Sequence, residues 1–129
     1  MAETLAPRVL VTGSRTWIDW VTMRDALLLA HSRYPNAVLV HGAAYGADCL
    51  ASAIWQHARG EVEAHPADWR MLGKRAGVIR NMEMVDSGVV LCLAFIRDGS
   101  PGASQCAEYA ESRGVETVRH TATTTRKEA

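Results

Sequence analysis

The chain alternates short apolar runs with segments of helical periodicity, and this alternation limits the folds available to it. The runs at residues 8–12, 37–41 and 89–95 are rich in Val and Leu and show little polar alternation. Such runs are typical of strands that are covered on both faces of a parallel sheet. Weaker runs at residues 61–66 and 115–118 complete a set of five. Strands that alternate with helices predict an α/β protein, a Rossmann-like three-layer sandwich of about five parallel strands.

Four segments between and after these runs have apolar residues at helical spacing. They span residues 19–34, 47–58, 75–86 and 103–113. Asp19 is suited to cap the first of them. The polar stretch at residues 120–129 shows no periodicity. We therefore expect a single domain over residues 1–129, with an ordered core of about 8–119 and a disordered tail at 120–129.

Composition excludes several classes of protein. No apolar stretch reaches the roughly 18 residues of a membrane span, and the N-terminus lacks the pattern of a signal peptide, so we expect a cytoplasmic protein without a membrane partner. Cys49, Cys92 and Cys106 are odd in number and have no CxxC spacing, which predicts neither disulfides nor a metal site. No cofactor is expected. A formal net charge of zero argues against binding nucleic acid through bulk charge.

Polar residues and glycines follow directly where the first strand ends. Gly13, Ser14 and Arg15 combine a tight turn with a hydroxyl and a forked cation. In open parallel sheets, ligands bind beyond the carboxyl ends of the strands, near the point where the strand order reverses. This position suits a phosphate, although the same residues taken alone are equally consistent with a turn and a solvated arginine.

The second strand ends in another loop of this kind, which runs directly into a helix. Gly42 and Gly46 permit close backbone approach, and the N-terminus of the following helix favours an anion. Asp48, in the first helical turn, either caps the helix or contacts a ribose hydroxyl or acts in catalysis. His41 is either a pocket residue or a strand-end histidine, and we favour the second interpretation.

A third cluster, at residues 67–81, places cations beside Trp69. Charge runs are usually solvated helix faces. Here glycines bracket Lys74, and Arg80 and Asn81 belong to the helix that leads to the fourth strand. That strand is followed by a further glycine-rich loop, which contains Gly99, Ser100 and Gly102 and precedes Ser104. Glycine-bearing loops at several strand ends favour a ligand site over a purely structural domain.

These motifs, in this order, resemble the YspA-like family of the SLOG superfamily, which also includes the DprA and LOG proteins. The resemblance rests on Thr12–Arg15, Trp17, Asp19, His41–Gly42, Gly46–Asp48, Ala67–Trp69, Gly73–Lys74, Ala76–Gly77, Arg80–Asn81 and Met84. It implies a small nucleotide-type ligand at the strand ends. Phosphate would lie at Gly13, Ser14, Arg15, Lys74 and Arg80, with close approach at Gly42, Gly46, Gly99 and Gly102. Asp48 and Asn81 would meet the sugar or base, and Trp17 and Trp69 could stack on the base.

The resemblance leaves two alternatives open. LOG proteins are phosphoribohydrolases whose PGGxGTxxE motif carries a glutamate, but Cys106 stands at that position here and Ala103 at the threonine position. A hydrolase would then need Asp48 as its carboxylate, with Ser104 in place of the lost hydroxyl. A thiol at position 106 is more consistent with an inert, buried side chain. DprA proteins bind single-stranded DNA, and this is the second alternative, against which the net charge of zero argues. The partners that we consider also include a second copy of the chain, in a homodimer.

Overall fold

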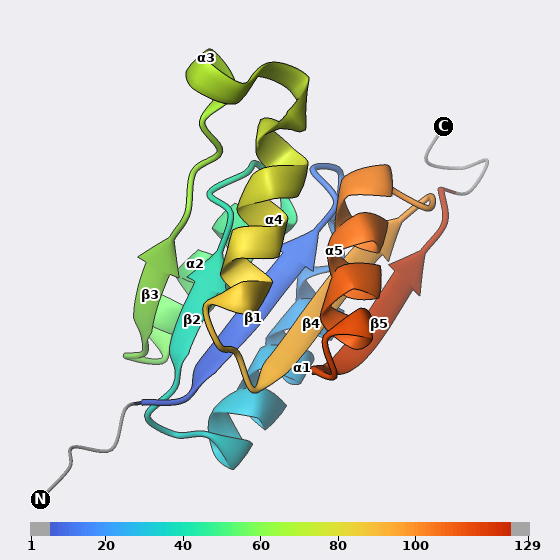
Figure 1. The fold of residues 1–129 in the computed structure, drawn as a ribbon. Helices are drawn as coiled ribbons and strands as arrows, with labels where there is room; N and C mark the ends of the chain where they lie inside the picture. Colours follow the sequence, from blue (N-terminus) through green and yellow to red (C-terminus); the bar gives the residue numbers. More distant parts are fainter. Residues whose placement is uncertain (1–5, 125–129) are drawn as a thin grey trace, which may run out of the picture.

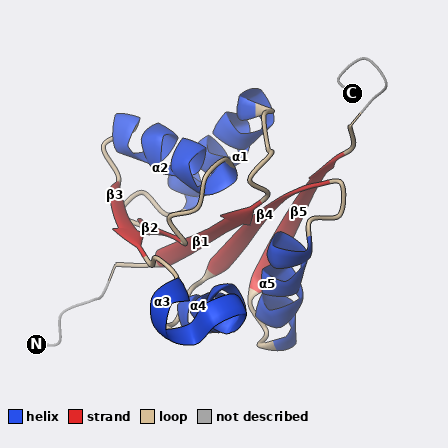
Figure 2. Ribbon diagram, turned by 90° about the horizontal axis from the view of Figure 1, so that it is seen from above, coloured by secondary structure: helices blue, strands red, loops and turns tan. Residues whose placement is uncertain are grey.

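The structure is a computed structural model that describes residues 6–124, and these form one five-stranded parallel sheet with helices on both faces (Figures 1 and 2). The elements are β1 (Arg8–Gly13), α1 (Trp20–Arg33), β2 (Val38–His41), α2 (Ala47–His57), β3 (Glu61–Ala64), α3 (Trp69–Leu72), the 3-10 turn η1 (Gly73–Arg75), α4 (Ala76–Asp86), β4 (Leu91–Arg97), α5 (Pro101–Ser112) and β5 (Glu116–Ala122). The predicted Rossmann-like α/β fold is confirmed.

The strand order is β3-β2-β1-β4-β5, and every neighbouring pair is parallel. The chain therefore builds outward from β1 to β3, returns across the sheet, and continues from β4 to β5. The order reverses between β1 and β4, so the loops that leave these two strands diverge and open a crevice at their carboxyl ends. Both loops carry residues that the sequence singled out.

Each strand of the sheet centre buries both of its faces. On one face, Val9 and Val11 of β1 pack with Met23 and Trp55 under α1 and α2. On the other face, Leu10 packs under α4 and α5. Figure 2 shows these two helical layers on opposite sides of the sheet. This two-sided burial explains why the central strands are continuous apolar runs rather than alternating ones.

The last strand extends further than the sequence predicted. β5 runs to Ala122 and stays in register with β4 up to the pair Arg97 and Ala122. Thr124 then donates from its backbone N–H and its hydroxyl to the carboxylate of Asp98. The expectation of a disordered tail from residue 120 is therefore wrong for 120–122. Residues 125–129 of that tail lie outside the described residues.

Within the part of the chain that the structure describes, no helix has both the length and the apolar character needed to cross a membrane.

Candidate ligand-binding cleft

A cleft of about 850 Å³ opens at the carboxyl ends of the strands, within the volume range of small-molecule sites. Four segments line it: the end of β1 and its loop, the loop from β2 into α2, the stretch from the loop after β3 through α3 into α4, and the start of α5. The predicted site residues among its lining are Gly13, Ser14, Arg15, Gly42, Asp48, Trp69, Lys74, Arg80, Asn81, Ser100 and Gly102. The structure thus brings together residues that lie up to 89 positions apart in the sequence.

The end of β1 is tied to its neighbours. A Cβ at Gly13 would overlap the side chain of Ala47, so the glycine lets α2 start directly against the strand. Ser14 is buried, and its hydroxyl accepts from the backbone N–H of Arg97 at 2.7 Å. That hydroxyl therefore joins the ends of β1 and β4, whereas the sequence suggested a phosphate contact for it. Arg15 is exposed on the lining of the cleft.

The carboxylate of Asp48 holds the loop after β2 through two hydrogen bonds. Its Oδ2 accepts from the backbone N–H groups of Gly42 at 3.0 Å and of Ala44 at 3.3 Å. Its Oδ1 is buried and has no hydrogen-bond partner among residues 6–124. Burial raises the pKa of this carboxyl to about 6, against the opposing effect of the two N–H groups and of Arg80. Half of a buried carboxylate thus remains unsatisfied beside the cleft, which calls for an explanation.

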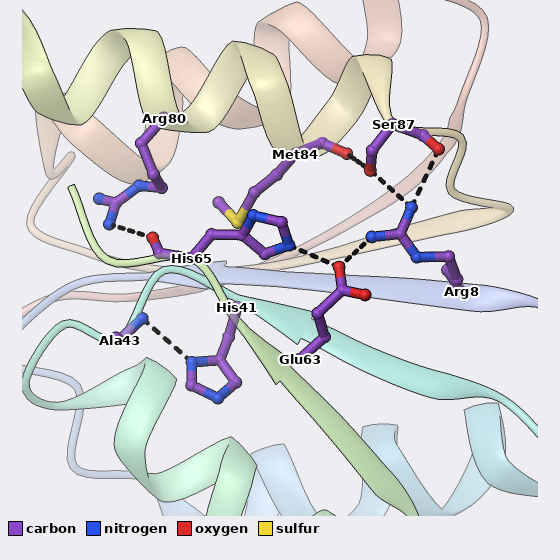
Figure 3. Close-up of polar contacts among 8 residues, drawn as sticks. All are labelled: Arg8, His41, Ala43, Glu63, His65, Arg80, Met84 and Ser87. Carbon is purple, nitrogen blue, oxygen red and sulfur yellow. Dashed lines mark hydrogen bonds and ion pairs between the residues drawn. The ribbon is translucent and has the colours of Figure 1, made fainter. Parts of the chain in front are cut away.

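Gly46 and His41 shape the same loop without lining the cleft. Gly46 has a φ of +76°, and a Cβ there would collide with the backbone of Arg15, so only glycine lets the loops after β1 and β2 touch. The Nδ1 of buried His41 accepts from the N–H of Ala43 at 3.0 Å, as drawn in Figure 3. Burial lowers the pKa of His41, with smaller contributions from His65 and Arg80. This arrangement agrees with a strand-end histidine.

Arg80 bridges the loops after β2 and β3. Its guanidinium donates to the backbone carbonyls of Gly42 and His65, the second at 3.3 Å (Figure 3), and to the Oδ1 of Asn81 at 2.8 Å. A Cβ on Gly42 would lie 2.6 Å from the guanidinium carbon, so the glycine makes room for this contact. Arg80 lines the cleft with a cation whose position is fixed by three acceptors.

Asn81 extends this network to α5. Its side-chain amide donates to the carbonyl of Gly102 at 3.4 Å and to the Oε1 of Gln105 at 3.1 Å.

A separate cluster of charged side chains lies next to Arg80. His65 lies 2.5 Å from the carboxylate of Glu63, and this carboxylate also pairs with Arg8 (Figure 3). The hydrogen bond from His65 is the largest of several effects that lower the pKa of Glu63.

Besides His41 and Gly46, three more of the predicted residues do not line the cleft. Trp17 is 4 % exposed, packs edge-on against Phe95 at 5.4 Å between ring centroids, and donates to the carbonyl of Asp19, so stacking on a ligand base is the wrong assignment for it. Gly99 has a φ of +63° in the turn after β4 and does not line the cleft. Ser104 lies within α5, and its N–H donates to the carbonyl of Ser100.

The sequence also left some lining residues unmarked. Tyr45 is 82 % exposed and Val78 is 42 % exposed, and both border the cleft. Gly77 accommodates the indole of Trp69, since a Cβ there would lie 3.1 Å from that ring. Cys106 is fully buried, and burial raises its pKa to about 11, as expected for an inert thiol. Tyr45 could have been recognised in the sequence, because it is an aromatic residue within the glycine-bearing loop after β2.

The family of this chain follows from comparison with known proteins. The model of the YspA, cpYpsA-related SLOG family matches residues 7–71. The chain belongs to this family. It is 44% identical over 117 residues to the Gene 61 protein of Mycobacterium phage D29, which covers 86% of this chain and 94% of that protein. The family resemblance predicted from the motifs is therefore confirmed, and the matched region contains the loops after β1 and β2.

Among solved structures, this SLOG chain is similar to DNA processing protein A (DprA) from Streptococcus pneumoniae. The TM-score is 0.53 at 16% sequence identity. The alignment covers 87% of this chain and 58% of the DprA chain, so the protein spans little more than half the length of that neighbour. At this identity, the likeness describes the fold.

Proposed function

We propose that the protein binds a nucleotide or a nucleotide-derived phosphate in this cleft. Membership in the SLOG family and the DprA-like fold favour a function connected with nucleotides or DNA. The observation that carries the proposal is the pairing, within one cleft, of exposed cations with a buried carboxylate that has one unsatisfied oxygen. Such a pairing suits a ligand that has an anionic group and hydroxyl or amine donors.

The phosphate would lie toward the cations and the start of α5. Arg15 and Lys74 are exposed on the lining of the cleft. The side chain of Ser100 makes no capping hydrogen bond to α5 within the described chain, so the first N–H groups of that helix are available to an anion. Pro101 occupies the first helical turn, where its missing N–H costs nothing. Ser14 and Arg80 act as supports of the loops.

The sugar or base would lie toward Asp48 and Trp69. The Oδ1 of Asp48 is covered by the protein, so a ribose hydroxyl or a base amine would reach it through a small shift of the loop after β2. A donor placed there would satisfy the buried oxygen, and hydrogen bonding to the charged form would lower its raised pKa. Trp69 is 52 % exposed and borders the cleft, where its ring can stack on a base. Tyr45 offers a second exposed ring at the rim.

The test compares a nucleoside monophosphate with its nucleoside by calorimetry or thermal shift. Arg15→Ala is expected to weaken binding of the monophosphate by about 1.5–3 kcal/mol, the range for a charge-assisted hydrogen bond, and to leave binding of the nucleoside nearly unchanged. Arg70→Ala is the matched control, because Arg70 is exposed on α3 and lies outside the lining. Equal weakening of both ligands would remove Arg15 from a phosphate site.

A hydrolase that uses Asp48 is the second candidate. A carboxyl with a pKa near 6 is suited to general acid–base chemistry at neutral pH. Cys106, at the position of the LOG glutamate, is buried and protonated, and it does not line the cleft. We therefore expect little release of free base from nucleoside monophosphates by chromatography. Robust release that disappears in Asp48→Asn, while ligand affinity persists, would establish the hydrolase instead.

Binding to single-stranded DNA is the remaining candidate. The net charge of zero predicts at most non-specific, micromolar binding to an unstructured oligonucleotide near physiological salt. Nanomolar binding at that salt would place DNA ahead of a small nucleotide.

A further inference from the structure

Helix α1 is apolar on two faces, although only one of them meets the sheet. Met23, Leu27 and Ala30 are buried in the core. The outward face nevertheless carries Trp20 at 52 % exposure and Leu29 at 67 %. A helix that is apolar all round is normally covered all round. In Figure 2, α1 lies in the outer layer with α2, and no other element of the described chain lies over them.

The exposed apolar face continues into a groove beside α2. Trp20, Arg24 and Leu28 form one wall, and Ile54 and His57 stand on the other. The groove has a volume of about 420 Å³ and is separate from the nucleotide cleft, with which it shares no lining residue. The inference that follows therefore does not depend on the proposed function.

The outward face is symmetric about its own middle. Arg24 and Asp25 form an exposed ion pair at 3.0 Å in the centre. An apolar pair lies one turn before them, at Trp20 and Val21, and another lies one turn after them, at Leu28 and Leu29. At 100° per residue these six positions fall within a half-circle of about 180°, so they share one face.

We propose that this face is a homodimer interface in which α1 packs antiparallel against α1 of a second copy about a two-fold axis. A two-fold interface must be complementary to itself. In this arrangement, the first half of one helix covers the second half of the other, so Trp20 and Val21 meet Leu28 and Leu29 of the second copy. The central charges of both copies also meet, and each Arg24 finds an Asp25 across the axis.

The central ion pair favours a second copy over an unrelated partner. Neighbouring residues on a helix do not face each other, and an exposed pair of this kind adds little to the stability of one chain. Across a two-fold axis the same two side chains supply both signs of charge from both sides. A partner of another sequence would need an independent set of opposite charges between two apolar patches.

An interface made by one helix from each copy lies at the small end of interface sizes, so we expect a roughly micromolar dissociation constant. Sedimentation velocity at protein concentrations of roughly 1–200 μM therefore tests the oligomeric state. We expect a species of about twice 14.1 kDa at the upper concentrations. Leu29→Lys should raise the dissociation constant at least about 10-fold. Met71→Lys is the control, since Met71 is 77 % exposed on α3, away from this face.

A charge exchange tests the two-fold pairing itself. Arg24→Asp and Asp25→Arg should each be monomeric, because each places four like charges at the centre of the interface. Mixed together, the two variants should form a heterodimer, since one then supplies only positive and the other only negative charges. Far-UV circular dichroism checks that each variant is folded. A monomeric wild type at 200 μM, a dimer insensitive to Leu29→Lys, or a mixture that stays monomeric would overturn the proposal.

Discussion

The loops after β1 and β2 line the same cleft as the segment from α3 to η1, but the two regions are held in different ways. In the loops, Ser14 and Gly42 are buried and hydrogen-bonded to distant parts of the chain, at Arg97 and Arg80, and buried Asp48 of α2 accepts from the N–H of Gly42. In the segment Trp69–Arg75, no residue is buried. Figure 1 shows α3 projecting above the sheet, where it adjoins α4.

This contrast separates the contributions to stability and to binding. Changes in the buried loops alter contacts that hold β1, β2 and α2 together, so they should lower the free energy of unfolding as well as affinity. Substitutions in the exposed segment Trp69–Arg75 alter surface that only a bound ligand would cover, so they should lower affinity but not the free energy of unfolding. Matched substitutions on the two sides test whether the separation holds.

The largest expected effect comes from a pair of glycines with similar backbone conformations. Gly46 (φ 76°, ψ −119°) and Gly73 (φ 60°, ψ −140°) both disfavour a side chain. A Cβ at Gly46 would also collide with the backbone of Arg15, whereas one at Gly73 would meet nothing within 4 Å. Gly46→Ala should therefore cost about 3–4 kcal/mol, and Gly73→Ala about 1–2 kcal/mol.

Urea unfolding of both variants measures this difference. Because the conformational strain is similar at the two positions, the remainder reports the contact between the loops after β1 and β2. Equal losses at the two glycines would mean that these loops can separate without cost, and the buried side of the cleft would then be no firmer than the exposed side.

The next effect is a pH dependence from Asp48. Its pKa in the folded state, about 6, lies above the ordinary value of 3.8, so the folded state binds the proton more tightly than the unfolded state does. Stability from this group is therefore fully present at low pH and is lost as pH rises from about 4 to above 6, by on the order of 3 kcal/mol. Asp48→Asn should remove that decline, since an amide oxygen can still accept from Gly42 and Ala44.

The readout is the difference in unfolding free energy between wild type and variant at pH 4 and pH 7. Asp68→Asn is the control on the exposed side: its carboxylate caps α3 through the N–H of Met71 and is exposed. That substitution should shift stability by about 0.5 kcal/mol or less. A difference between wild type and Asp48→Asn that is the same at both pH values would show that Asp48 is not desolvated as its burial indicates.

Local patterns in the sequence predicted the central strands and the cleft. Strands buried on both faces appear as continuous apolar runs, and the loops that line the cleft appear as glycines and polar residues directly after those runs. The end of β5 gave no such signal. It is an edge strand whose residues alternate in exposure, and Arg119 on it pairs with Glu111 while His120 stacks on Phe95. In the sequence, a polar edge strand of this kind looks like an unstructured tail, because its pairing with β4 is not visible there.

The roles of individual cleft residues were harder to predict, because distant contacts decide them. Ser14 and Arg97 are 83 residues apart, and their hydrogen bond directs the serine hydroxyl toward β4. Trp17 is in a loop, but Phe95 of β4 supplies the surface that buries it. The sequence identified both residues as special. It could not show whether a ligand or the protein itself uses their polar atoms.

The smallest effect on stability, with a clear effect on binding, is expected at Trp69. Its side chain is 52 % exposed and rests on Gly77, so Trp69→Ala should change the unfolding free energy by less than about 1 kcal/mol. If the ring stacks on a ligand base, the same substitution should weaken the binding of a nucleoside monophosphate by about 1–3 kcal/mol. Trp69→Phe should retain part of that affinity, and Met71→Ala, on the same short helix but outside the cleft lining, should retain all of it. Calorimetry and urea unfolding on the same three variants separate the two quantities. If Trp69→Ala lost more stability than affinity, the indole would be a structural support for α4, and stacking on the base would fall to Tyr45 in the loop after β2 instead.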